Sequence, residues 1–309
     1  MSRRRRTILG SALLAALAAG AALSQEFPGM PGGGRGPFGG GRPPFGGPFG
    51  GRGPFGGRRA PLDDRRGVPD WDVLDRFPED VFTFARVRYG SYGGRGWGRR
   101  GGGGGGWETD WPDSDLNFSY RLQQLTSLKV NPNPVIVDLT DEKLFDYPFL
   151  YMIEPGGLVF EEEEVVALRR HLLNGGFLMV DDFWGDWQYE NFEREIRRVF
   201  PDREPVELPL EHPVFQCVYK LTERPQVPSM HSWLETGETW EDRHGPGARE
   251  VHYKGISDDQ GRLMVIICHN TDLGDGWERE GEDPSYFQEF AVKKSYPMGI
   301  NIVTYAMTH

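Results

Sequence analysis

The sequence predicts an α/β fold built on a mainly parallel β-sheet. Apolar segments of strand length alternate along the chain with segments of helical periodicity, the order expected of βαβ units. Several strand segments are apolar throughout, as in a sheet that helices cover on both faces. One of them, Phe177–Val180, ends directly on Asp181 and Asp182. Because open α/β sheets bind ligands beyond the carboxyl ends of their strands, this acid pair marks the edge where we expect the function to lie.

The amino-terminal residues have the three parts of a signal peptide. Arg3–Arg6 form a charged region, Ile8–Leu23 an apolar region, and small residues near Ser24 suit cleavage. We therefore expect export to the periplasm or cell envelope and a mature chain that begins at Gln25. The arginines allow either the general secretory or the twin-arginine route. An uncleaved signal that anchors the protein in a membrane is the alternative.

A low-complexity stretch follows the signal. The motif Pro-Phe-Gly-Gly occurs four times between Pro37 and Gly57, with arginines scattered around it. Glycine of this density cannot recover its ordering entropy by burying side chains, so we predict a disordered linker over residues 25–79. The alternative is a segment whose Arg and Phe side chains contact anionic cell-wall polymer, lipid or the acidic domain itself. A single domain is expected at 80–309, with a glycine-rich loop at 93–106.

Charge divides the chain into two unlike parts. Residues 1–60 contain nine arginines and one acidic residue, a net charge of +8, so residues 61–309 carry −19 of the total of −11. Such an acidic domain repels phosphates, which excludes a non-specific nucleic-acid binder. We expect a small molecule, a glycan or a protein as partner, and membrane contact only through an uncleaved signal or the basic linker. Cys217 and Cys268 form one disulfide or stay free; their spacing leaves both open.

Composition and periodicity define the first elements of the domain. Val81–Tyr89 is rich in Phe and Val, and Pro134–Leu139 and Phe149–Ile153 are apolar runs of strand length. Ser114–Thr126 and Glu161–Leu173 place their apolar residues at helical spacing, and the second begins with four glutamates, which the helix dipole favours. Strands and helices therefore alternate up to the acid pair.

The elements after the acid pair have weaker signals. Asn191–Phe200 is predicted to be a short helix, and the proline-rich stretch after it indicates extended segments and turns. Glu250–Ile256 and Arg262–Cys268 flank a turn and are predicted to form a hairpin. The last helix is expected at Tyr286–Ala306, bent or interrupted by Pro297. The second half of the domain is therefore expected to carry more irregular structure than the first.

Several local motifs, taken in order, resemble the bacterial domain-of-unknown-function family 4159. They are Phe84-Ala-Arg86-Val-Arg-Tyr89, Trp111-Pro112-Asp113, Asp146-Tyr-Pro-Phe-Leu-Tyr151, Gly175-Gly-Phe-Leu-Met-Val-Asp181-Asp182, His212-Pro-Val-Phe215 and Gly299-Ile-Asn-Ile-Val-Thr-Tyr305. The resemblance runs from about Phe82 to the carboxyl terminus and places the chain in the class I glutamine-amidotransferase-like superfamily. It implies a three-layer, flavodoxin-like fold and no established activity.

The resemblance also implies a departure from the enzymes of that superfamily. Glutamine amidotransferases need a cysteine on the sharp turn after a strand and a downstream histidine to activate it. Here that turn holds Asp181-Asp182-Phe183. The related trehalose-utilisation-like proteins have a histidine near this place, which this chain also lacks. Glutamine amidotransferase activity is therefore not expected.

Candidate catalytic residues are Asp181, Asp182 and His212. With Asp186 they also form a possible set of metal ligands, because carboxylate oxygens with one imidazole suit Mn, Mg or Zn. The competing interpretation is structural: one carboxylate caps the next segment, or pairs with Arg86 or Arg88. No cofactor is predicted.

Candidate binding residues are Arg86, Tyr89, Trp111, Asp182 and Trp184, in a concave site shared with the His212 loop. Aromatic side chains beside carboxylates suit sugars, whose ring faces stack and whose hydroxyls donate hydrogen bonds. They equally suit a packed lid.

Two further polar groups near the end of an apolar strand have simpler explanations. The run His269–Asp272 is interpreted as turn chemistry. Cys268 lies inside the apolar strand and is expected to be a core residue rather than a nucleophile.

Three functions remain in order of preference. The first is an exported, non-catalytic α/β domain that binds a ligand or partner, because the superfamily's nucleophile is missing and a fold alone implies no reaction. The second is a metal-assisted or carboxylate-dependent hydrolase, with glycans as one substrate class. The third is a glutaminase that uses Cys217 or Cys268.

Overall fold

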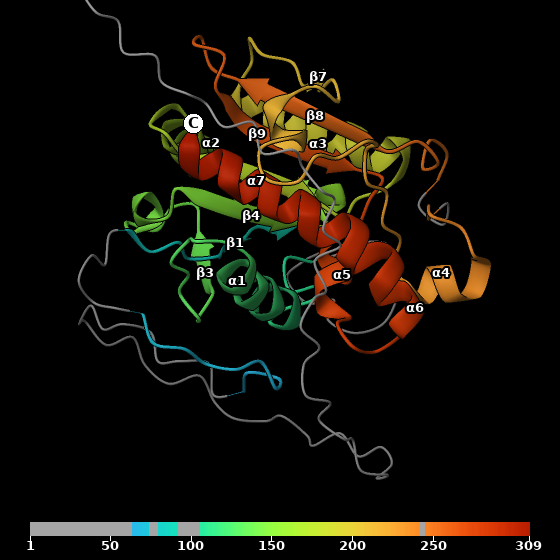
Figure 1. Ribbon diagram of the computed structural model, residues 1–309. Coiled ribbons are helices and arrows are strands. Elements are labelled where there is room, and N and C mark those ends of the chain that lie inside the picture. The colour runs from blue at the N-terminus through green and yellow to red at the C-terminus, as the bar shows by residue number, and fades with distance from the viewer. Residues whose placement is uncertain (1–63, 74–79, 92–105, 242–244) are drawn as a thin grey trace, which may run out of the picture. The chain divides into compact units, whose positions relative to one another are not determined.

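The structure is a computed structural model that describes residues 64–73, 80–91, 106–241 and 245–309 (Figure 1). All of these belong to one compact unit. The predicted signal peptide, most of the predicted linker and nearly all of the loop at 93–106 lie outside the described residues. No helix in the described ranges is both long and apolar enough to cross a bilayer.

A sheet of seven strands forms the centre of the described domain, in the order β3-β1-β4-β6-β9-β8-β7. Strands β1, β3, β4, β6 and β9 run parallel, whereas β8 pairs antiparallel with β9 and the edge strand β7 pairs antiparallel with β8. The strands are β1 (Ala85–Arg88), β3 (Val135–Asp138), β4 (Phe149–Ile153), β6 (Phe177–Asp181), β7 (Val206–Glu207), β8 (His252–Ser257) and β9 (Leu263–His269), with a separate antiparallel pair of β2 (Gly90–Ser91) and β5 (Leu158–Val159). The predicted parallel sheet and the predicted hairpin of β8 and β9 are confirmed.

Strand β6 has the central position predicted for it. It is hydrogen-bonded to β4 on one side and to β9 on the other, and all five of its residues are buried. An unbroken apolar run requires this position, because it has no face to offer to solvent.

Helices cover both faces of the sheet and make three layers. They are α1 (Asp113–Leu125), α2 (Glu162–Leu173), α3 (Gly185–Val199), α4 (Met230–Thr236), α5 (Leu273–Glu278), α6 (Pro284–Tyr286) and α7 (Tyr296–Thr308), with 3-10 turns η2 (Leu144–Asp146), η3 (Pro155–Gly157) and η4 (Pro213–Phe215) and the π-helix η6 (Phe287–Ser295). Helices α2 and α3 pack on one face, where Leu168 and Phe192 join the same core as Leu150 and Val180. Helices α1, α5 and α7 cover the other face, which is toward the viewer in Figure 1.

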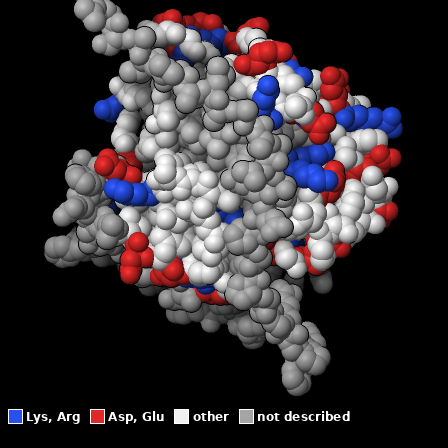
Figure 2. Space-filling view, in the orientation of Figure 1, with Lys and Arg blue, Asp and Glu red and all other residues white. Residues whose placement is uncertain are grey.

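The face toward the viewer is held by aromatic contacts. Phe84, directly before β1, lies 5.6 Å from Phe118 of α1, ring centre to ring centre, and Phe118 lies 4.4 Å from Trp277 of α5. Phe177 at the start of β6 contacts Tyr305 of α7. Helix α7 contains no charged residue, and in Figure 2 the charged side chains of this face lie mainly around its border. Apolar packing therefore joins this layer to the sheet.

Two helices differ from their predicted bounds. Helix α3 begins at Gly185 rather than 191, because polar side chains fix its first turn: Trp184 N donates to Gln188 Oε1 (2.6 Å) and Gly185 N to Asn270 Oδ1 (2.9 Å). The carboxyl-terminal helical run, predicted at Tyr286–Ala306, extends from Pro284 to Thr308, and its type changes from π to α just before Pro297. Pro297 is the second residue of α7, so its missing N–H falls where the hydrogen-bonding pattern already changes.

Part of the segment expected to be a linker contacts the domain. Arg65 Nη1 donates to Pro132 O (2.9 Å), Trp71 Nε1 donates to Val130 O (2.8 Å), and Val68 is buried. These contacts fix residues 64–73 against the loop between α1 and β3. The ordered chain therefore includes residues before Asp80, where we expected folding to start.

The two cysteines do not form a disulfide. Cys268 is buried inside β9, and Cys217 is exposed on another part of the domain. The prediction that Cys268 is a core residue is confirmed.

Candidate functional site

Asp181 is the last residue of β6 and is fully buried. Its Oδ2 accepts hydrogen bonds from the Tyr151 hydroxyl (3.2 Å) and from Gly274 N (3.0 Å), whereas its Oδ1 has no hydrogen-bond partner. Burial raises the pKa of Asp181 to about 7, although these donors oppose the shift. The carboxyl group therefore changes its charge near neutral pH.

Asp182 forms the turn between β6 and α3. Its φ of 54° is left-handed, a conformation that residues other than glycine adopt at an energetic cost. Its Oδ1 accepts a hydrogen bond from Trp184 Nε1 (2.9 Å). Burial, with the neighbouring Glu154 and Asp110, raises the pKa of Asp182 well above its usual value. The sharp turn after the strand that we expected here is present, and Asp182 is its strained residue.

Loops after the neighbouring strands bring further carboxylates to the same edge. Seven acidic residues lie there, and we call them the acid cluster: Asp110, Glu154, Asp181, Asp182, Asp272, Asp275 and Glu278. They meet because parallel strands bring their carboxyl ends to one edge: β4 leads to Glu154, β6 to the acid pair and β9 to Asp272. Mutual repulsion follows, since Asp182 and Asp275 add to the effect of burial in raising the pKa of Asp272.

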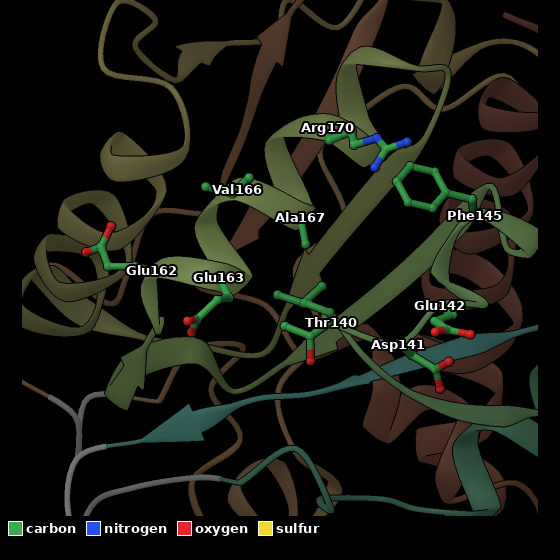
Figure 3. Close-up of a pocket in the computed structure, with 10 residues that line it drawn as sticks. Thr140, Asp141, Glu142, Phe145, Glu162, Glu163, Val166, Ala167 and Arg170 are labelled. Carbon is green, nitrogen blue, oxygen red and sulfur yellow. The ribbon is translucent and has the colours of Figure 1, made fainter. Parts of the chain in front are cut away.

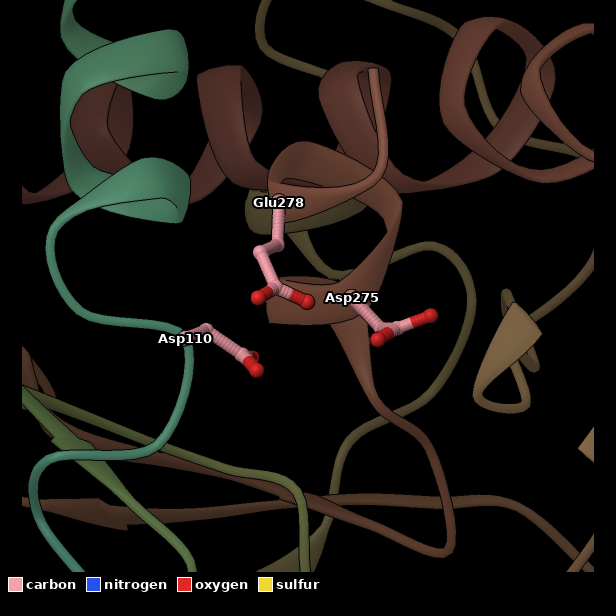
Figure 4. Close-up of side chains that lie close together, drawn as sticks. All are labelled: Asp110, Asp275 and Glu278. Carbon is pink, nitrogen blue, oxygen red and sulfur yellow. The ribbon is translucent and has the colours of Figure 1, made fainter. Parts of the chain in front are cut away.

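Three members of this cluster form a compact group that we call the acid triad, Asp110, Asp275 and Glu278. One carboxylate oxygen from each lies within 4.8 Å of the other two. In Figure 4 the side chains come from two segments, Asp110 from the loop before α1 and Asp275 and Glu278 from the helix α5. Asp110 Oδ2 is buried and has no hydrogen-bond partner. The arrangement supplies oxygen ligands from both sides of a small space.

The charges of the triad are strongly perturbed. Burial raises the pKa of Asp110 well above its usual value, and Glu278 and Asp275 raise it further. Burial also raises the pKa of Glu278 to about 7, partly opposed by Arg279. Asp275 is held by hydrogen bonds from Met230 N (2.6 Å) and from Arg279 Nε (3.3 Å). The triad is therefore a fixed group of acids whose simultaneous ionisation is costly.

Gly274 leaves room for this arrangement. A Cβ at this position would lie 2.9 Å from the Tyr151 hydroxyl and 3.0 Å from Asp110 Oδ2. Its backbone N–H donates to Asp181, so a single glycine adjoins both the acid pair and the triad.

Arg86, predicted to bind a ligand, instead has a structural role beside the acid cluster. Its guanidinium is fully buried, pairs with Asp115, and donates to the carbonyl oxygens of Trp107 (3.0 Å) and Thr109 (2.7 Å) and to Ser114 Oγ (2.9 Å). These contacts hold the loop that carries Asp110. Neither predicted pairing with the acid pair is found, because Asp115 takes Arg86 and Asp138 takes Arg88.

The aromatic residues predicted to bind a ligand also have structural roles around the acid cluster. The Tyr89 hydroxyl donates to the carbonyl oxygens of Ile153 and Glu154, both at 2.7 Å, and so fixes the loop that carries Glu154. Trp184 is 2% exposed, which leaves no ring face for a sugar to stack on. The Arg86 guanidinium lies 5.9 Å from the ring centre of Trp111. Among the predicted binding residues, only Asp182 belongs to the acid cluster.

The structure does not bring His212 to the acid pair. Its Nδ1 accepts from Val214 N (3.2 Å), and its ring lies 5.5 Å from that of Tyr305. Tyr305 in turn contacts Phe177, at the amino end of β6 and so at the opposite edge of the sheet. The predicted site shared with the His212 loop is therefore wrong. The proline-rich segment before His212 gave no periodicity from which its edge could be inferred.

Asp186 also lies apart from the acid pair. It is exposed on the first turn of α3, and its carboxylate lies against Gly247. Asp181, Asp182, Asp186 and His212, the candidate metal ligands, therefore do not form one group.

Sequence reasoning missed Asp110, Glu154, Asp275 and Glu278. One signal was available: Asp272, Asp275 and Glu278 follow an apolar strand at intervals of three, which places acids on consecutive turns of a short helix. Turn chemistry was the right interpretation of Asp272 itself, whose Oδ1 accepts from Asp275 N (2.7 Å) and caps α5. Asp110 had no such signal, because its place depends on Arg86.

Comparison with known proteins gives a family but no activity. No curated protein matches the chain. The family described as "Domain of unknown function (DUF4159)" matches residues 83–307, most of the chain and nearly all of the described domain. The chain therefore belongs to the DUF4159 family.

Proposed function

We propose that this protein is an exported, non-catalytic α/β domain that binds a divalent cation at the acid triad. The observation that carries the proposal is the meeting of three carboxylate oxygens within 4.8 Å, one of which, Asp110 Oδ2, is buried without a hydrogen-bond partner. Buried polar atoms are almost always satisfied, so an orphaned oxygen facing other acids points to a cation.

The chemistry of the group fits a hard cation. Carboxylate oxygens suit Mg²⁺, Mn²⁺ and Ca²⁺, which complete their shells with water. Asp110 and Glu278 are partly exposed, which leaves a route for the ion and its water ligands. A bound cation would remove the repulsion that raises the pKa values of the triad. Binding would therefore also stabilise the fold.

Binding to the purified protein tests this proposal. Calorimetric titration with Mn²⁺ is expected to show one site per chain. Asp110→Asn keeps the shape but removes the charge, and should weaken binding by at least about tenfold, the usual scale for perturbing a metal site. Asp186→Asn, at an exposed carboxylate elsewhere on the domain, is the matched control and should leave the affinity unchanged. Equal binding by the three proteins would refute the site.

Two features support a binding domain over a catalytic one. The strained turn after β6, where an amidotransferase of the resembled superfamily would carry its cysteine, holds Asp182. Burial raises the pKa of Cys268 well above its usual value and also raises that of Cys217, so both thiols stay protonated. We also propose that the domain has a flavodoxin-like fold and belongs to the class I glutamine-amidotransferase-like superfamily.

A metal-assisted hydrolase is the second candidate. It is favoured by Asp181, whose pKa of about 7 suits a general base. The complete burial of Asp181 favours the binding domain, because a substrate cannot reach a carboxylate that has no accessible surface.

Export is part of the proposal and has its own test. Sequencing of the mature amino terminus should give Gln25, because the small residues before it suit cleavage. A chain that keeps Met1 and stays with the membranes after a salt wash would contradict cleavage.

A further inference from the structure

A pocket lies on the face of the sheet opposite α7, between the segment after β3 and the helix α2 (Figure 3). Its volume is about 480 Å³, within the range of ligand pockets. Val166 is 59% exposed and Phe145 is 46% exposed, so apolar surface is open to solvent here. An exposed apolar surface in a hollow is typical of an interaction site.

The rim of this pocket is acidic. Four carboxylates surround the apolar part: Asp141 and Glu142 on one side, Glu162 and Glu163 at the start of α2 on the other. Arg170 adds one positive charge, and its guanidinium lies 4.9 Å from the centre of the Phe145 ring. The pocket therefore suits an occupant that is aromatic and cationic, and repels anionic lipid or polymer.

We propose that the occupant is the chain's own residues 37–59. This segment repeats Pro-Phe-Gly-Gly four times and contains Arg42, Arg52, Arg58 and Arg59. A phenyl ring enters the apolar part beside Val166, and the arginines face the acidic rim. The charges agree, since residues 1–60 carry +8 and the remainder of the chain −19.

The chain before Asp64 is long enough for residues 37–59 to reach the pocket. Residues 64–73 are fixed beside Pro132 and Asn133, just before β3, and the pocket begins with Leu139, just after β3. A strand of four residues spans roughly 13 Å. About nine residues separate Phe55 from Asp64 and can extend to roughly 30 Å. A tether of this length holds its end at an effective concentration of about a millimolar, so even a weak contact is populated.

Chymotrypsin cleavage of the full chain tests the docking, because the enzyme cuts after phenylalanine and a docked ring is protected. Val166→Lys places a positive charge at an exposed position of the pocket and should repel the arginines. Cleavage within residues 37–59 is expected to become about two- to fivefold faster, in proportion to the released fraction. Val206→Lys, at a valine on β7 that is 65% exposed, is the matched control and should cleave like the natural chain.

A second variant leaves the folded domain untouched. In this variant Phe38, Phe45, Phe49 and Phe55 are replaced by Ser, so no residue of the pocket changes. Loss of the docked phenyl rings should speed hydrogen exchange of the pocket residues 139–146 and 162–170. Unchanged exchange there, or equal cleavage of Val166→Lys and the natural chain, overturns the proposal. If protection from chymotrypsin falls when the protein is diluted about tenfold, the pocket holds the linker of a second copy. That result would also overturn the proposal of docking within one chain.

Discussion

In the metal-free protein, Asp181 is expected to contribute stability that is lost as pH rises from about 4 to 7. Asp181 has a folded pKa of about 7, above the ordinary value near 4 for the unfolded chain. The folded state therefore binds more protons in this window, so the stabilisation is complete below about pH 4 and is lost as pH rises through 7. The loss from this buried group alone is on the order of a few kcal/mol.

Unfolding by urea at a series of pH values measures this slope. Asp181→Asn should flatten it, because the amide does not titrate. Asp186→Asn removes an exposed acid from the same strand-to-helix region and should keep the natural slope. If Asp181→Asn has the same pH dependence as the natural protein, burial does not control the charge of Asp181.

Arg86→Gln is expected to destabilise the fold by about 3–5 kcal/mol, the scale for removing one partner of a buried ion pair. Asp115 would remain fully buried without its guanidinium, and three oxygen acceptors would lose their donor. Thermal and urea unfolding measure the loss.

Arg88→Gln is the matched control, two residues further along the same strand. Arg88 also pairs with an aspartate, Asp138, but their side chains are 48% and 41% exposed. Exposed pairs contribute about 0–1 kcal/mol, so this change should be small. Equal effects of the two substitutions would show that Arg86 does not hold the loop before α1.

The sequence predicted the parts of this site that depend on local pattern. The apolar run of β6 required a central strand, and its two aspartates required the carboxyl edge. Both are found. The helix after them was predicted six residues short because Gln188 and Asn270 fix its first turn, and such polar contacts leave no apolar periodicity.

The partners of the charged residues could not be predicted in the same way. Arg86 and Asp115 are separated by a glycine-rich stretch, and nothing in the spacing shows which acid the arginine meets. Arg86 holds Asp110 at the site by binding the carbonyl oxygens of Trp107 and Thr109 before it and the side chain of Ser114 after it. His212 was assigned to the wrong edge because a loop without periodicity can return to either end of a sheet.

The location of a bound cation tests the central proposal most directly. Crystals grown with Mn²⁺ should give one anomalous peak on the described domain, roughly 2.0–2.6 Å from oxygens of Asp110, Asp275 and Glu278. Asp110→Asn crystals grown in the same way should lack it. A peak elsewhere with the triad empty, or an unchanged peak in Asp110→Asn, would contradict cation binding at the acid triad.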